Sequence, residues 1–366
     1  DRSETLSQAQ QSTNSPHYQP ASLPISQSTH LPVYQALVIG VALVLGLIVT
    51  RPMANWFHVQ SPPNVVYGAQ YEYQADFGEQ VRLLAYDLED WKVGGVEGYP
   101  IFQSSSLPGI ETRAGSSLPL VLYWRALAPL TANYSVFVHL DAPDGTTYAS
   151  ADELNPADIP TSRWPPSLYV RNPLTLTLPP DLPPIRYTLM AGLYHPEGGA
   201  RLPVTGCDGC PAAVGGDAIP LANVWVSSAA GVDERDIPNQ VNLGVGDQIT
   251  LLGYELTGGD PARLTLYWRA EAPVEASYTV FIHALDAEGA IIGQFDAPPL
   301  DGLYPTDAWL PGQIILDERS LALPETVHAL SIGLYDPASL TRLPVTDESG
   351  ARVPGDAVRI QDTGDR

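Results

Sequence analysis

Basic side chains are scarce in this sequence of 366 residues. Lys92 is its only lysine, and 18 basic residues stand against 41 acidic ones, so the formal net charge is −23 at pH 7. A protein that binds nucleic acid needs a basic surface to neutralise phosphates. The same deficit argues against a domain that lies on an anionic membrane surface. We therefore expect no nucleic-acid partner.

Cysteine is also rare, because Cys207 and Cys210 are the only two. A zinc site would need two more ligands at suitable spacing, and no second CxxC occurs. The CxxCH motif of haem attachment and the spacings of iron–sulfur sites are missing as well. We expect no cofactor and no metal. A local disulfide between Cys207 and Cys210 is our prediction, and two free thiols are the alternative.

Helical periodicity is missing outside one apolar stretch, and so are the familiar catalytic motifs. No serine or cysteine stands in a nucleophile elbow, and no HExxH spacing occurs. Proline (36 residues) and glycine (31 residues) are abundant, and charged residues make up only 16%. This composition is typical of many short strands joined by turns. We expect a mainly β protein that is not an enzyme.

The sequence repeats itself in order. The segment FGEQVRLLAYDL at 77–88 returns as VGDQITLLGYEL at 245–256, and LYWRA at 122–126 returns at 266–270. The motifs Y-x-VF-x-H, PT-x-x-W, GLY-x-P and RLPVT also occur in both copies. Such a duplication indicates two copies of one folding unit. A residue that both copies keep is therefore more typical of the fold than of a unique active site.

The duplication sets the expected domain boundaries. We expect a low-complexity polar tail at 1–32, a transmembrane helix at 33–50, a juxtamembrane linker at 51–63, a first β-sandwich domain at 64–227, a linker at 228–236 and a second β-sandwich domain at 237–361. Matching blocks lie 168 residues apart before the LYWRA motif and 144 apart at that motif. The first copy therefore carries an insertion at about 89–117. A surface elaboration and a binding loop are the two interpretations of it.

Alternating apolar and polar positions predict the strands. In the first LYWRA block Leu120, Leu122 and Trp124 fall on one face, and Val121 and Tyr123 fall on the other. We expect the strand at 120–126 to pair in antiparallel fashion with the strand at 134–140 across the intervening loop. Further strands are predicted at 174–178, 186–194 and 218–226. Short strands separated by turns favour a β-sandwich.

The segment Val33–Thr50 has the length and polarity of a membrane span. Its 18 residues would rise about 27 Å as a helix, close to the ~30 Å of a hydrocarbon core. A signal peptide would begin with basic residues, and about thirty polar residues come first here. We expect a single-pass protein of a bacterial cell membrane that contacts the lipid bilayer through residues 33–50. The domains that follow would be extracytoplasmic, although Arg51 favours the opposite orientation.

Two pairs of residues could carry a function. Trp164 and Trp309 follow the same Pro-Thr in two loops, where an indole could stack on a sugar ring or plug the end of the sandwich. His139 and His283 share one strand position near carboxylates, which would suit acid–base chemistry or a hydrogen-bonded structural role. We favour the structural role in both cases.

The shared motifs resemble a repeat at the extracytoplasmic C-terminal end of bacterial membrane glycosyltransferases related to the dolichyl-phosphate-mannose–protein mannosyltransferase family. The resemblance covers about 77–360. It implies a β-rich module outside the membrane, with sugar binding as one role. The family's chemistry lies in a multi-span membrane part that this chain lacks, so no catalytic residue carries over.

We therefore expect a non-catalytic accessory subunit of a larger bacterial membrane complex, with respiratory and photosynthetic complexes as candidate settings. Its partners would be other membrane-protein subunits. The alternative is a carbohydrate-binding ectodomain with a glycan as its ligand.

Overall fold

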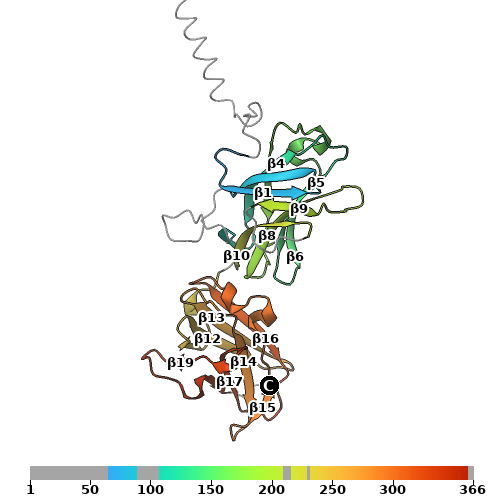
Figure 1. Ribbon diagram of the computed structural model, residues 1–366. Helices are drawn as coiled ribbons and strands as arrows, with labels where there is room; N and C mark the ends of the chain where they lie inside the picture. Colours follow the sequence, from blue (N-terminus) through green and yellow to red (C-terminus); the bar gives the residue numbers. More distant parts are fainter. Residues whose placement is uncertain (1–64, 89–106, 209–215, 229–230, 362–366) are drawn as a thin grey trace, which may run out of the picture. The chain divides into compact units, whose positions relative to one another are not determined.

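The computed structural model describes residues 65–88, 107–208, 216–228 and 231–361 (Figure 1). The predicted tail, transmembrane helix and first linker lie outside the described residues. None of the helical segments among the described residues has the length and apolar character of a membrane span. The chain is mainly β, as expected, and the helical segments within the described ranges are short 3-10 turns.

Residues 65–227, which we call repeat 1, form two five-stranded sheets. The first sheet has the order β7-β4-β2-β1-β9 and is antiparallel throughout. The second has the order β3-β10-β8-β5-β6, and only β3 and β10 run parallel. The strands are β1 (Tyr71–Phe77), β2 (Val81–Leu88), β3 (Gly109–Arg113), β4 (Ser117–Ala126), β5 (Ser135–Asp141), β6 (Thr147–Glu153), β7 (Val170–Thr177), β8 (Arg186–Tyr194), β9 (Val204–Asp208) and β10 (Ile219–Ser227).

Residues 237–361, which we call repeat 2, form two sheets with a matching strand order. One sheet has the order β16-β13-β12-β11-β19, and the other has the order β15-β14-β17-β18 with β20 also paired to β17. The strands are β11 (Gln240–Val245), β12 (Ile249–Thr257), β13 (Ala262–Ala270), β14 (Thr279–Leu285), β15 (Ile291–Gln294), β16 (Ile314–Leu321), β17 (Ala329–Asp336), β18 (Thr341–Arg342), β19 (Val345–Thr346) and β20 (Val358–Gln361). The repeated sequence thus encodes a repeated topology.

Short 3-10 turns connect several strands. They are η2 (Pro156–Asp158), η3 (Thr161–Arg163), η4 (Glu234–Asp236), η5 (Pro299–Gly302), η6 (Thr306–Ala308) and η7 (Pro354–Asp356). The loops that carry η3 and η6 contain the two PT-x-x-W motifs.

The predicted alternation of β4 is confirmed. Leu120, Leu122 and Trp124 are at most 1% exposed and belong to the main apolar core. Val121 and Tyr123 on the opposite face are buried too, in a small outer cluster with Leu84 and other residues. This sandwich-like packing therefore buries both faces of its central strand.

The expected pairing of β4 with β5 is wrong. β4 pairs with β2 and β7, whereas β5 pairs with β6 and β8 in the other sheet. The intervening loop is tied to other segments, because Leu127 N–H donates to the Gln80 carbonyl (2.8 Å) and Tyr134 N–H donates to the Thr161 hydroxyl (2.8 Å). Both strands show the same alternation, so alternation alone could not choose their partners.

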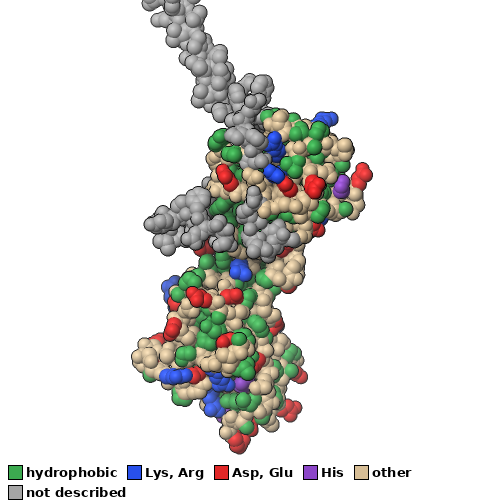
Figure 2. Space-filling model, in the orientation of Figure 1, with side chains coloured by type: hydrophobic (Ala, Val, Ile, Leu, Met, Phe, Trp, Pro, Cys, Tyr) green, Lys and Arg blue, Asp and Glu red, His purple; other side chains and the backbone are tan. Residues whose placement is uncertain are grey.

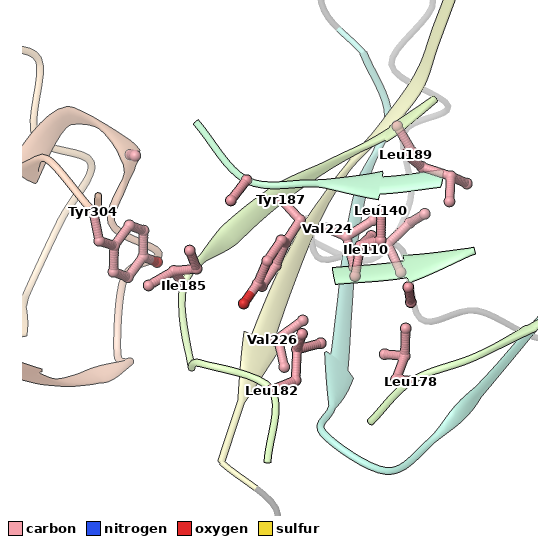
Figure 3. Close-up of a cluster of buried hydrophobic side chains, with 14 of the residues drawn as sticks. Ile110, Leu140, Leu178, Leu182, Ile185, Tyr187, Leu189, Val224, Val226 and Tyr304 are labelled. Atoms are coloured by element: carbon pink, nitrogen blue, oxygen red, sulfur yellow. The ribbon is translucent and has the colours of Figure 1, made fainter. Parts of the chain in front are cut away.

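The expected insertion at 89–117 contains a strand. Residues 89–106 lie outside the described residues, but β3 lies within the insertion and extends the second sheet of repeat 1 beside β10. Ile110 of β3 is 1% exposed and lies among Leu189, Val224 and Val226 (Figure 3). This part of the insertion is therefore core structure and not a surface loop. Among the described strands, repeat 2 has no counterpart of β3.

Candidate functional site

The two loop tryptophans lie in the core. Trp164 is 2% exposed and Trp309 is 4% exposed. Each indole N–H donates to a backbone carbonyl five residues earlier, that of Ile159 (3.2 Å) and that of Tyr304 (2.9 Å). So little exposed area leaves no face on which a sugar ring could stack in this conformation. Their position fits the alternative interpretation, an indole that fills the sandwich.

The Pro-Thr that precedes each tryptophan has a role that the sequence did not reveal. Thr161 and Thr306 are fully buried, and each hydroxyl accepts a hydrogen bond of 2.8 Å from the backbone N–H of the tyrosine that begins the preceding Y-x-VF-x-H motif, Tyr134 and Tyr278. A buried hydroxyl and a backbone donor satisfy each other in this way. The recurrence of Pro-Thr in both copies is the sequence feature that could have indicated this structural role.

The predicted disulfide involves one residue outside the described part. Cys207, in edge strand β9, is disulfide-bonded. Cys210 is the only other cysteine of the sequence and lies outside the described residues.

A cluster around Phe137 unites three of the repeated motifs. Phe137 in β5 lies directly opposite Gly192 in β8. A Cβ at Gly192 would lie 2.4 Å from the phenyl ring, so the ring covers the space that a side chain would need. The Arg201 guanidinium stacks on the ring, with its Cζ 4.3 Å from the ring centroid. His139 packs beside the ring, with centroids 4.6 Å apart.

Repeat 2 builds the same cluster. Phe281 in β14 lies opposite Gly333 in β17, and a Cβ there would lie 2.7 Å from the ring. The Arg342 Cζ lies 4.1 Å from the ring centroid, and the His283 ring centroid lies 5.0 Å from it. We call each set the Phe–Gly–Arg–His cluster. It explains the motifs VF-x-H, GLY-x-P and RLPV as one packing arrangement in which an aromatic ring covers a glycine on the neighbouring strand.

Each histidine of the clusters faces a carboxylate and an arginine. His139 Nε2 lies 3.8 Å from Asp152 Oδ1, and the Arg201 Nη2 lies 3.4 Å from His139 Nδ1. His283 Nε2 lies 3.4 Å from Asp296 Oδ1. Because a guanidinium lies at each ring, the arrangement fits a hydrogen-bonded structural role better than that of a general base. Among the described residues no group of three or more His, Cys, Asp or Glu side chains could hold a metal ion.

His139 should stay neutral at pH values at which an ordinary histidine becomes protonated. Burial lowers its pKa, and Arg201 acts in the same direction, whereas Asp141, Asp152 and Asp217 act against them. Because the pKa in the folded state lies below that in the unfolded state (~6.5), stability is complete above about pH 6.5 and falls as the pH drops below it. NMR titration of the ring protons, with His139→Gln to assign the signal, should give a midpoint below 6.5. A midpoint at or above 6.5 would contradict this environment.

On the face of the molecule seen in Figure 2, acidic side chains are scattered among apolar and uncharged ones, so acidic charge does not single out a site on that face.

No family model matches the sequence, and no curated protein matches it. The comparisons therefore supply neither a family nor a site residue, and the resemblance to the glycosyltransferase module remains an expectation.

Proposed function

We propose that this chain is a non-catalytic interaction subunit of a bacterial membrane complex. Val33–Thr50 anchors it in the bilayer, and two β-sandwich domains in tandem face the extracytoplasmic side. The resemblance to the C-terminal module of membrane glycosyltransferases supports domains of this kind. Sugar binding through Trp164 and Trp309 is not part of the proposal, because both indoles are buried.

One observation carries the proposal. The residues that recur in both copies fill the core or hold strands together: the ring of Phe137 covers Gly192, and the Thr161 hydroxyl binds a buried backbone N–H. Repeat 2 uses the equivalent residues in the same way. A duplicated module whose shared residues serve packing suits a scaffold that presents surfaces to partners.

Affinity purification of the full-length tagged chain from its native membranes in mild detergent tests the proposal. We expect membrane-protein partners in stoichiometric amounts. The control is a variant with Leu43→Arg and Leu45→Arg, because an arginine at the centre of a span costs about 2.5–3.5 kcal/mol on insertion scales. That variant should leave the membrane fraction and lose the partners. Migration of the wild-type chain as a lone monomer would contradict the proposal.

A further inference from the structure

Repeat 2 contains an open pocket beside Tyr278, whereas the equivalent tyrosine of repeat 1, Tyr134, is covered by other side chains. The pocket has a volume of about 400 Å³. It is built from the VGDQ turn, the tyrosine of Y-x-VF-x-H and the RLPV motif, and its lining residues are Val245, Gly246, Asp247, Gln248, Ile249, Tyr278, Leu343 and Pro344. The repeat therefore offers an internal comparison of a closed site with an open one.

In repeat 1 an imidazole ring covers the equivalent tyrosine. The ring of His195 packs against Tyr134 with centroids 4.7 Å apart, and Tyr134 is only 2% exposed. The Tyr134 hydroxyl donates to Gln80 Oε1 at 2.7 Å. Tyrosine, glutamine and imidazole thus close this corner of repeat 1.

Two sequence differences and one changed hydrogen bond distinguish repeat 2. Asp336 replaces the histidine, and Val245 replaces the bulkier Phe77. The glutamine is the same in both repeats, but the amide of Gln248 donates to the Pro273 carbonyl (2.7 Å). Asp336 is held in its own turn, where its carboxylate accepts from Ala338 N–H (2.9 Å). No ring stacks on Tyr278 among the described residues.

From this comparison we infer that the pocket binds one planar, nitrogen-bearing aromatic ring against Tyr278. In repeat 1 the ring that packs against the equivalent tyrosine is an imidazole. Asp247 is the only charged residue in the lining and is exposed, so it favours a ring that carries an N–H donor or a positive charge. The volume lies within the usual range of small-ligand sites. The ring can come from a partner's side chain, as the proposed function suggests, or from a free small molecule.

Ligand-observed saturation-transfer NMR on the purified full-length chain tests this with benzamidine, imidazole and benzyl alcohol. We expect millimolar binding, because the ligands have few atoms. Benzamidine should bind best, since its amidinium can pair with Asp247, and benzyl alcohol should bind worst. A peptide with the sequence GLYHPEG, taken from repeat 1, tests whether the pocket accepts a histidine side chain of a protein partner.

The decisive variants change Asp336. Asp336→His restores the residue of repeat 1, and its own imidazole should cover Tyr278 and weaken benzamidine binding at least about tenfold. Asp336→Asn keeps a side chain that can accept the turn's hydrogen bonds but adds no ring, so it should bind as the wild type does. Absence of binding by every probe would overturn the inference, and so would equal binding by the His and Asn variants. Because this assay uses the purified chain alone, its result is independent of the co-purification test of the proposed function.

Discussion

Replacing Arg319 by leucine is expected to destabilise repeat 2 by about 3–5 kcal/mol. Arg319 is 6% exposed and Asp317 is fully buried. Two hydrogen bonds join them, from Arg319 Nε to Asp317 Oδ1 (2.8 Å) and from Nη2 to Oδ2 (2.9 Å). The substitution leaves a buried carboxylate without its cation. Chemical denaturation of the full-length chain would measure the loss.

Repeat 1 provides the matched rescue. The sheet registers place Asn172 where repeat 2 has Asp317, and Leu174 where it has Arg319. The same framework therefore accepts an apolar residue at the arginine position when the carboxylate is absent. The double variant Asp317→Asn with Arg319→Leu should recover most of the stability that Arg319→Leu loses. If the double variant is no more stable than the single one, the loss comes from packing and not from the unpaired charge.

The pH dependence of Arg319→Leu should confirm the cause. Burial raises the pKa of Asp317, and the Arg319 guanidinium opposes this effect in the wild type. Without the arginine the pKa in the folded state lies further above that in the unfolded state, so the folded variant gains stability as the pH falls through the raised pKa. The difference in the free energy of unfolding between the wild type and Arg319→Leu should thus become smaller as the pH is lowered from 7.

Replacing Gly192 by alanine should cost about 3 kcal/mol. The added Cβ would lie 2.4 Å from the Phe137 ring and 2.7 Å from the Asp217 carbonyl oxygen, and a backbone atom cannot move aside as a flexible side chain does. Denaturant unfolding checks the value. Gly293→Ala in β15 is the control, because its Cβ would meet its nearest neighbours at 3.4 Å and should change stability little. Equal stability of the two variants would show that the packing of the Phe137 ring does not require a glycine at position 192.

The sequence was informative where local patterns decide the structure. The duplication predicted two copies of a β unit, and the alternation around Trp124 predicted which residues face the core. The pairing of the strands could not be predicted, because β4 and β5 have the same alternating pattern. Nothing in the loop between them indicates that the chain crosses to the other sheet. The insertion pattern predicts a loop although β3 lies within it, because five residues with one buried isoleucine give almost no periodic signal.

The candidate site was harder to predict for a different reason. The motifs VF-x-H, GLY-x-P and RLPV were visible as repeats, but their contacts join residues that are far apart in the sequence, such as Phe137, Gly192 and Arg201. A single sequence does not show which of them meet. The indole of Trp164 was likewise open to both interpretations, because exposure depends on how the surrounding loops pack. The difference between the two repeats at Tyr278 depends on the contacts of Tyr134 with His195 and Gln80, which are also far apart in the sequence.

Hydrogen–deuterium exchange of the full-length chain tests the central claim most directly, namely that the residues shared by the two repeats hold each β unit together. We expect Gly192→Ala to speed exchange in β5 and β8, and Gly333→Ala to speed it in β14 and β17, each within its own repeat. Unchanged exchange in both variants would contradict the account, because the shared residues would then have to be kept for something other than packing.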